Sequence, residues 1–256
     1  MKIAILADSL AMPREDVGGN EMLEVTYPFL LDQSLRRQFG AAAPIIFERG
    51  MRRRTIEYVL DEWNELVELR KPEMVIVHVG IVDCAPRVFL RREASFVANI
   101  KVAWLRDRIL KYAHEHRRAI VQRRRKVYVP LWRFEKLVQE VVQKAQETEV
   151  RSLVFINIIR PPDSVEERSP GFQNNVIAYN RVLEEQTKHP IVSLVALDQL
   201  IREEGGSEKL TVDGIHLNER GHVLLARELE QLVTGFQDLQ DVHDKSCNPE
   251  NLVNPV

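Results

Sequence analysis

Five short apolar segments recur along the chain and predict the strands of one parallel sheet. Each is rich in Val, Ile and Leu and lacks the polar alternation of a strand that has one face in water. Such segments are expected to be buried on both faces, as the strands of a parallel sheet are. The segments are 2–7, 43–48, 73–80, 151–159 and 191–197.

Stretches with apolar residues at helical spacing lie between these segments. Residues 54–70 form one, which Lys71-Pro72 ends, and residues 174–188 form another. A third covers 218–235, with Asn218 as its N-cap and Gly235 as its end. Because strands alternate with helices, we expect helical crossovers and a single α/β sheet.

The stretch 88–150 is longer than one crossover requires. Residues 95–125 predict a long basic helix and residues 133–148 a second helix. We interpret the stretch as a helical insertion within one domain that covers residues 1–235. Residues 236–256 are polar and contain two prolines, so we expect a C-terminal tail that packs loosely or is disordered.

Composition and charge fit an ordinary soluble domain. The chain has 256 residues, of which 45% are hydrophobic and 29% charged, and its net charge is −2. This small charge gives no reason to expect nucleic acid as a partner. Two cysteines make no disulfide framework, and no stretch resembles a secretory signal or reaches the roughly 20 apolar residues of a membrane span. We therefore expect a cytoplasmic enzyme or binding protein.

Polar residues follow the carboxyl ends of the predicted strands, where ligands bind in open parallel sheets. Four of these residues are arginines, each after a different strand, and Asn157 follows the fourth strand. Surface arginines in structural ion pairs are one interpretation, and a clamp that binds a carboxylate or phosphate group is the other. The arginines are Arg14, Arg49, Arg87 and Arg160.

Ser9, Asp213 and His216 are the candidate catalytic residues. Ser9 comes directly after the first strand, where a serine most often serves a turn or a helix cap. A serine hydroxyl is a weak nucleophile unless a base activates it. Asp213 and His216 are three residues apart in a loop before the last helix. In such a loop the carboxylate can orient the imidazole while the second ring nitrogen faces Ser9.

The blocks "ADSL" (7–10) and "DGIHLNERGH" (213–222) resemble the first and last motifs of the SGNH, or GDSL-type, hydrolases. The resemblance covers about residues 1–235. It implies a flavodoxin-like three-layer α/β/α sandwich around a five-stranded sheet. It also implies that Ser9 is the nucleophile, His216 the base and Asp213 its partner, with no metal or organic cofactor.

The sequence departs from the family pattern at two positions. Ala7 replaces the usual first glycine, and Val82 stands where the family has an asparagine that donates a hydrogen bond to the oxyanion. Losing such a donor costs roughly 2.7–4 kcal/mol of the activation barrier. The remaining family donors are the Ser9 N–H and the glycine of the second block, here Gly50. We expect Asn157 or an arginine to replace the missing donor.

These features predict a serine esterase that removes a small, acetyl-like acyl group. The expected substrate is a polar, carbohydrate-like small-molecule or glycan ester, and the arginines leave an anionic substrate open. Two other functions stay open, namely an O-acyltransferase that uses the same acyl-enzyme and a non-catalytic module that binds an anion or a sugar. The insertion could form a lid or bury the contact of a homo-oligomer.

Overall fold

The computed structural model describes residues 1–13 and 24–246, with side chains to residue 238. It contains one five-stranded sheet in the order β2-β1-β3-β4-β5, and every pair of neighbours is parallel. Each strand lies at one of the five apolar segments. The bounds are Lys2–Ala7 for β1, Ile45–Gly50 for β2, Met74–His78 for β3, Ser152–Ile156 for β4 and Val192–Val195 for β5.

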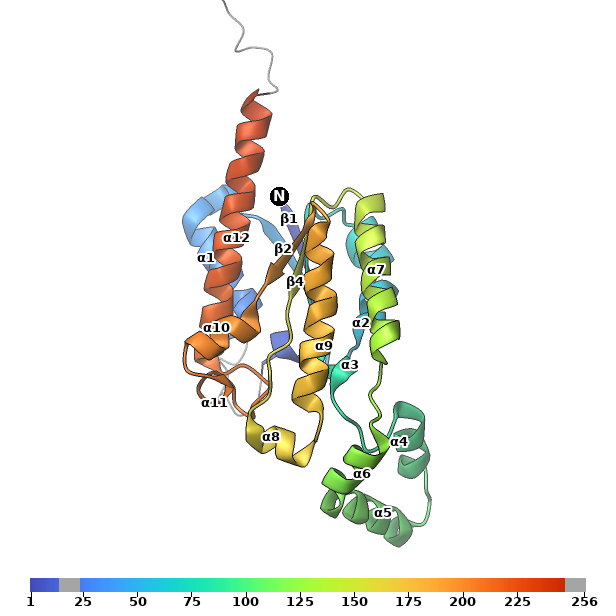
Figure 1. The fold of residues 1–256 in the computed structure, drawn as a ribbon. Helices are drawn as coiled ribbons and strands as arrows, with labels where there is room; N and C mark the ends of the chain where they lie inside the picture. Colours follow the sequence, from blue (N-terminus) through green and yellow to red (C-terminus); the bar gives the residue numbers. More distant parts are fainter. Residues whose placement is uncertain (14–23, 247–256) are drawn as a thin grey trace, which may run out of the picture.

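Helices cover both faces of the sheet and make three layers (Figure 1). The side chains of β1 alternate between the two faces of the sheet. Ile3 and Ile5 pack into the core on one face, and Ala4 and Leu6 pack into the core on the other. One layer has α1 (Tyr27–Phe39), α10 (Leu197–Glu203) and α12 (Glu219–Ser246), and the other has α2 (Ile56–Asp61), α7 (Leu131–Glu147) and α9 (Phe172–Glu185). The predicted three-layer α/β/α sandwich is confirmed.

Short elements complete the chain. They are the 3₁₀ turns η1 (Ser9–Ala11), η3 (Gly40–Ala42) and η5 (Gln186–Lys188), the π-helical turn η4 (Asn64–Glu68), and the helices α3 (Ile81–Cys84), α8 (Asp163–Arg168) and α11 (Ser207–Leu210). The helix predicted over 54–70 is therefore divided between α2 and η4.

The strand order reverses beside β1, because β2 pairs on one side of it and β3 on the other. The chains that leave β1 and β3 diverge there, and this is where ligands bind in sheets of this order. Ala7 lies level with Gly50 and His78, so the three strands end together. Gly80 then turns the chain into α3 with φ 124°, and a Cβ there would lie 2.7 Å from Ile158 Cδ1.

The predicted helix over 95–125 is wrong. The structure has α4 (Arg91–Ala98), α5 (Ala103–Glu115) and α6 (Arg117–Arg124) instead. Asn99 ends α4, where its side chain donates to the Ser95 carbonyl at 2.8 Å and competes with the helical pattern. The three helices lie beyond the carboxyl ends of the strands (Figure 1). Ala113 of α5 and Val121 of α6 form a small core with Val88, which precedes α4.

Helix α7 is part of the sandwich although it falls within the stretch 88–150. Phe134, Val138 and Val141 pack into the main core with residues of α2 and α9. The predicted helix end at Gly235 is also wrong, because α12 continues to Ser246. Gly235 lacks a positive φ and no proline follows before Pro249, so nothing in the sequence forces the helix to stop. The last residues of the predicted tail, 247–256, lie outside the described residues.

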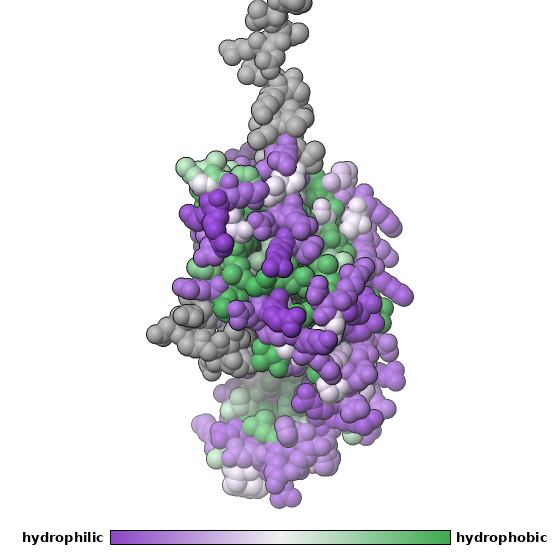
Figure 2. All heavy atoms as spheres, turned by 90° about the vertical axis from the view of Figure 1, so that its left-hand side faces the viewer, coloured by the Kyte–Doolittle hydropathy of each residue, from purple (hydrophilic) through white to green (hydrophobic). Residues whose placement is uncertain are grey.

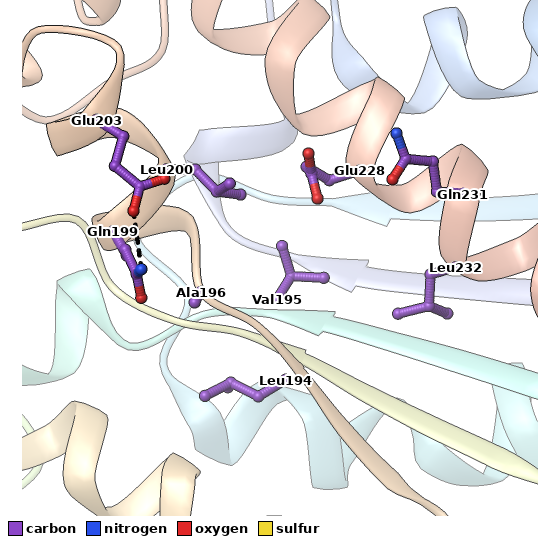
Figure 3. Close-up of a pocket in the computed structure, with 9 residues that line it drawn as sticks. All are labelled: Leu194, Val195, Ala196, Gln199, Leu200, Glu203, Glu228, Gln231 and Leu232. Atoms are coloured by element: carbon purple, nitrogen blue, oxygen red, sulfur yellow. Dashed lines mark hydrogen bonds between the residues drawn. The ribbon is translucent and has the colours of Figure 1, made fainter.

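The side of α1 and α12 carries apolar surface between polar regions (Figure 2). Between β5, α10 and α12 lies a groove of about 510 Å³, lined by Leu194, Leu200 and Leu232 among others (Figure 3). None of the candidate site residues lines it. Among the helices of the described residues, none is both long and apolar enough to cross a membrane.

Candidate active site

The Asp8-Ser9 pair ends β1 and begins a 3₁₀ turn. Asp8 is fully buried, and its Oδ1 accepts a hydrogen bond from the Leu10 N–H at 2.9 Å, which caps η1. The Asp8 N–H donates to the His78 carbonyl of β3 at 3.1 Å. The first bond holds the turn and the second fixes it to β3, and the turn presents the partly exposed Ser9 at the edge where the strand order reverses.

Ser9, His216 and Asp213 form one chain of contacts. Ser9 Oγ lies 3.1 Å from His216 Nε2, and His216 Nδ1 lies 2.8 Å from Asp213 Oδ2. The other Asp213 oxygen, Oδ1, accepts the backbone N–H groups of Ile215 at 3.1 Å and His216 at 2.8 Å. The structure therefore brings together three residues that come from opposite ends of the sequence.

The loop that carries Asp213 and His216 is tied down at several points. The Gly214 N–H donates to Thr211 Oγ1 at 2.9 Å, and the Val212 N–H donates to the His216 carbonyl at 2.8 Å. Gly214 has φ 83°, and a Cβ there would lie 2.7 Å from Pro162 Cδ. Asn218 Oδ1 accepts the Gly221 N–H at 3.1 Å, which confirms Asn218 as the N-cap of α12.

The charge state of Asp213 follows from these contacts. Partial burial raises the pKa of Asp213, but the hydrogen bonds from the His216 ring and backbone and from the Ile215 N–H lower it further, so the net pKa lies well below the usual value. The carboxylate is therefore ionised at neutral pH. It favours the tautomer of His216 that has its proton on Nδ1, and this tautomer leaves Nε2 free to accept the Ser9 proton.

Ser9 and His216 line a cleft of about 590 Å³. The loop after β2 contributes to its wall, as do the segment after β3 and the helical insertion. The wall combines apolar side chains with four arginines. Its other residues are Arg52, Arg53, Ile81, Val82, Ala85, Arg87, Val88, Phe89, Ala94, Arg117, Tyr128, Phe172 and Ile215.

The structure brings only part of the predicted arginine set to this cleft. Arg87 lines it, whereas Arg49 and Arg160 do not. Arg49 is about half exposed on β2, with its Nε 3.7 Å from Glu62 Oε2. Arg14 lies outside the described residues.

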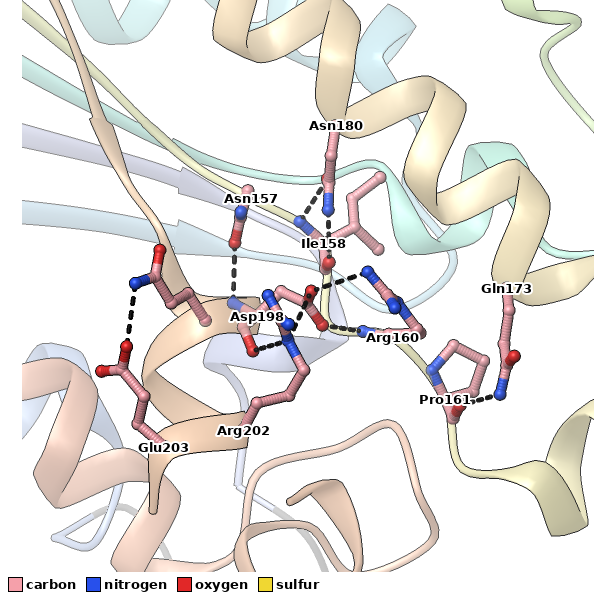
Figure 4. A network of polar contacts seen from close by, with 10 residues as sticks. Asn157, Ile158, Arg160, Pro161, Gln173, Asn180, Asp198, Arg202 and Glu203 are labelled. Carbon is pink, nitrogen blue, oxygen red and sulfur yellow. Dashed lines mark hydrogen bonds and ion pairs between the residues drawn. The ribbon is translucent and has the colours of Figure 1, made fainter. Parts of the chain in front are cut away.

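Arg160 and Asn157 belong to a separate network around Asp198 (Figure 4). Asn157 Oδ1 accepts the Asp198 N–H at 2.8 Å, and Asp198 Oδ1 accepts the Arg160 N–H at 2.7 Å. Arg160 Nη2 and Arg202 Nε lie 3.5 Å and 3.3 Å from Asp198 Oδ2. These contacts fasten the end of β4 to α10, so Asn157 is engaged there and does not line the cleft.

Val82 lines the cleft with Ser9, and its carbonyl accepts a hydrogen bond from Arg87 Nη2 at 2.9 Å. Gly50 lies at the end of β2 beside Ala7. A Cβ on Gly50 would lie 3.2 Å from Met12 Cγ and 3.7 Å from Ala11 Cβ, so the strand packs closely against the turn that holds Ser9. Gly50 is nevertheless not among the residues that line the cleft.

Sequence reasoning missed Arg52, Arg53, Arg117 and Tyr128 as cleft residues. The run of three arginines at 52–54, after β2, was a signal for the first two. Arg117 and Tyr128 come from the insertion, and nothing local to them indicates that the insertion folds back to the ends of the strands. The insertion thus supplies one wall of the cleft.

Two other polar side chains of this region, Cys84 and His222, are buried and so do not face the cleft. Burial raises the pKa of the Cys84 thiol, which donates to the Ile81 carbonyl at 3.8 Å. His222 is buried on α12, its Nδ1 accepts the Tyr27 N–H at 3.2 Å, and burial lowers its pKa to about 4. His216 is therefore the histidine of this region that faces the cleft.

Asp83 is a buried carboxylate with an unusual pKa. Its Oδ1 accepts the Ile56 N–H at 2.9 Å and so holds the first turn of α2, while its Oδ2 is buried without a partner. Burial raises the pKa of Asp83 to about 7, from an ordinary value of 3.8, against the lowering effect of its backbone hydrogen bonds. The folded state therefore retains a proton that the unfolded chain releases between these two values.

We expect Asp83→Asn to stabilise the protein at about pH 8 and to have less effect at about pH 4.5. Between the pKa of the unfolded chain and the raised pKa of the folded state, the unfolded state binds fewer protons than the folded state. The carboxyl group therefore lowers the stability of the protein as the pH rises through this range. Asparagine keeps an acceptor for Ile56 without the charge. Urea unfolding of both proteins at both pH values tests this, with Asp61→Asn on the exposed side of α2 as control. A gain that is equal at both pH values would contradict the assignment.

Comparisons with known proteins agree with this architecture. A model of the GDSL-like lipase/acylhydrolase family matches residues 13–224. A search of curated proteins finds no match. A lipase/acylhydrolase from Enterococcus faecalis has a similar structure, with a TM-score of 0.64, 14% identity, and coverage of 91% of this chain and 95% of that chain. A putative lipolytic protein of the G-D-S-L family from Desulfitobacterium hafniense has a TM-score of 0.57, 14% identity, and coverage of 90% and 98%.

An acetylxylan esterase from Geobacillus stearothermophilus is also similar. One of its catalytic mutants, in which a serine is replaced by alanine, has a TM-score of 0.58, 16% identity, and coverage of 90% of this chain and 92% of that chain. Two further catalytic mutants of that esterase replace an aspartate and a histidine three positions after it. At these identities the similar structures show the fold, whereas the family match covers most of the sequence. The chain therefore belongs to the GDSL-like lipase/acylhydrolase family and is an ester-hydrolysing enzyme.

Proposed function

We propose that this enzyme is a serine esterase in which Ser9 is the nucleophile, His216 the general base and Asp213 the group that orients His216. The observation that carries the proposal is the contact chain from Ser9 Oγ to His216 Nε2 at 3.1 Å and from His216 Nδ1 to Asp213 Oδ2 at 2.8 Å. The spacing of Asp213 and His216 equals that of the aspartate and histidine changed in the esterase mutants, which supports the same roles here.

The proposed reaction has two steps. Ser9 Oγ attacks the ester carbonyl and its proton passes to His216 Nε2, while Asp213 stabilises the imidazolium that results. The imidazolium then protonates the leaving alkoxide, and the alcohol departs from an acyl-enzyme on Ser9. In the second step His216 takes a proton from water, the water oxygen attacks the acyl carbonyl, and the proton returns to Ser9 as the acid is released.

The oxyanion requires donors at the same place. The Ser9 N–H is one candidate, and the close packing of Gly50 against this turn supports its N–H as another. Val82 supplies no side-chain donor, and the engagement of Asn157 with Asp198 argues against the replacement that the sequence suggests. Of the predicted replacements, Arg87 lines the cleft, but its Nη2 donates to the Val82 carbonyl, so we propose the Ser9 and Gly50 N–H groups as the oxyanion donors.

We propose a small acyl group, acetyl-like, on a polar and carbohydrate-like alcohol. The apolar part of the lining, which includes Ile81, Val82 and Ile215, suits a short acyl chain, and the arginines suit a polar alcohol. The acetylxylan esterase among the similar structures supports this substrate class. The same acyl-enzyme would allow transfer to a sugar hydroxyl, but no contact in the cleft favours transfer over hydrolysis.

Labelling with a fluorophosphonate probe tests the proposal without knowledge of the substrate. The probe is expected to modify the full-length protein on Ser9, as peptide mass spectrometry would show, because it reacts with activated serines. Ser9→Ala and His216→Ala should prevent labelling, whereas Ser193→Ala, an exposed serine on β5, should label normally. Failure of the wild-type protein to label would favour a non-catalytic binding module and would overturn the proposal.

A further inference from the structure

The arginines of the cleft differ from the other basic residues in their ion pairs. None of Arg52, Arg53, Arg87 and Arg117 forms an ion pair with any residue in the described part of the chain, whereas several basic residues that do not line the cleft are paired. Arg124 and Lys126 share Glu93, Arg133 pairs with Glu57, and Arg160 and Arg202 share Asp198. Unpaired arginines therefore gather where Ser9 and His216 open to solvent.

Arg87 is held in place by neutral groups alone. Its Nη2 donates to the Val82 carbonyl at 2.9 Å, and its guanidinium carbon lies 4.3 Å from the centre of the Tyr128 ring. Its Nε is buried without a partner. A guanidinium has five N–H donors, so this arginine is fixed in position while the described residues leave most of its donors unused.

Arg117 reaches the cleft from α6 in a similar way. Its Nε donates to Ser169 Oγ at 3.0 Å and its Nη2 to the Pro86 carbonyl at 3.3 Å. Burial lowers the pKa of both Arg87 and Arg117. Tyr128, Cys84 and Asp83 raise the pKa of Arg87 while Arg117 lowers it, and Arg168 lowers that of Arg117. Cations that are partly removed from water cost stability unless an anion pairs with them.

Arg52 and Arg53 face the same cleft from the loop after β2. Arg53 has φ 64°, a left-handed conformation that is uncommon for residues other than glycine. Its carbonyl accepts a hydrogen bond from Arg91 Nη2 at 3.3 Å, which ties this loop to the start of α4. The loop after β2 and the insertion thus place cations in the wall of one space of about 590 Å³.

We propose that the alcohol part of the substrate carries an oxyanion, a carboxylate or a phosphate, which Arg87 and Arg117 bind with support from Arg52 and Arg53. The planar guanidinium group pairs with both kinds of oxyanion through parallel hydrogen bonds. This inference rests on the proposed esterase function, because it places the ester beside Ser9 and the anion against the arginines of the same cleft. The anion then supplies the compensating charge, which no ion pair among the described residues provides for these arginines, and it sets the orientation of the ester.

Binding to the full-length Ser9→Ala variant separates this inference from catalysis. The probes are 4-acetoxybenzoate, 4-acetoxyphenyl phosphate and the uncharged methyl 4-acetoxybenzoate, titrated by isothermal calorimetry. At least one anionic ester is expected to bind about tenfold or more tightly than the methyl ester, since a charge-assisted contact exceeds a neutral one by this order. The tighter of the two anions identifies the group as a carboxylate or a phosphate.

Matched variants in the Ser9→Ala background locate the site. Arg117→Gln is expected to remove most of the preference for the anion, and Arg118→Gln, on the neighbouring exposed arginine of α6, to leave it intact. Arg87→Lys keeps the charge but not the planar fork, so it should lower the preference by a smaller factor. Should Arg87→Lys not fold, the pair Arg52→Gln with Arg53→Gln provides the second arm.

Equal binding of all three esters at millimolar concentration, or a preference that survives Arg117→Gln and the second arm, would overturn the inference. Neither result would affect the proposed esterase, which the fluorophosphonate test decides through Ser9. Conversely, a preference for the anion in a protein that the probe does not label would leave an anion-binding cleft without a serine nucleophile. The two proposals therefore fail separately.

Discussion

Ser9→Ala is expected to lower kcat/KM for 4-nitrophenyl acetate by roughly three orders of magnitude or more, because residues that act as one nucleophilic unit cannot replace one another. His216→Ala should cost a similar factor, since Ser9 Oγ then has no base at 3.1 Å. The double variant should be hardly slower than either single variant. This lack of additivity distinguishes a shared reaction step from two independent losses of binding.

The control for this prediction is Ser193→Ala, which changes an exposed serine on the edge strand β5 and should leave the rate unchanged. Circular dichroism and thermal unfolding would verify that the variants are folded. If Ser9→Ala kept the wild-type rate, another residue would be the nucleophile. If the two losses multiplied in the double variant, His216 would not act through Ser9.

The fold could be predicted because its main signal is local. A strand buried on both faces is apolar at nearly every position, so Lys2–Ala7 and Met74–His78, each with one polar residue at an end, stand out in the sequence without knowledge of their neighbours. Helix limits are less local. Gly235 can end a helix or continue it, and Phe236, the residue after it, packs against the core that α12 shares with α1, which favours the longer helix.

The residues of the candidate site also differ in how far local sequence determines their positions. Asp213 and His216 are close in sequence, so one loop decides their geometry, and Ser9 follows a strand whose position is easily predicted. The arginines depend on how distant segments fold back. Arg160 follows β4 as expected, but the buried Asp198 draws it toward α10. Arg117 is far from any strand end in the sequence, and only the break of the insertion into α4, α5 and α6 brings it to the cleft.

Asp213→Asn is expected to be the most informative change in the site, with a loss in kcat of roughly four orders of magnitude. Two backbone N–H groups, those of Ile215 and His216, need an acceptor at Oδ1. In asparagine the amide oxygen must therefore take this position, so the NH₂ group faces His216 Nδ1. Because an NH₂ group can only donate there, the ring would carry its proton on Nε2 and could not accept the proton of Ser9.

Asp213→Ala separates this effect from a simple loss of structure. Alanine removes the acceptor for both N–H groups, so it should destabilise the loop more than asparagine does. It does not impose the wrong tautomer, however, so its kcat should be no lower than that of Asp213→Asn. Asp213→Asn should thus be more stable than Asp213→Ala without being more active. The control Glu219→Gln, at the exposed start of α12, should change neither stability nor activity. Thermal unfolding and ester kinetics on the same preparations measure both orders. If Asp213→Asn were instead both more stable and more active than Asp213→Ala, Asp213 would serve only to hold the loop. A residue with that role alone cannot make the more stable variant the slower enzyme.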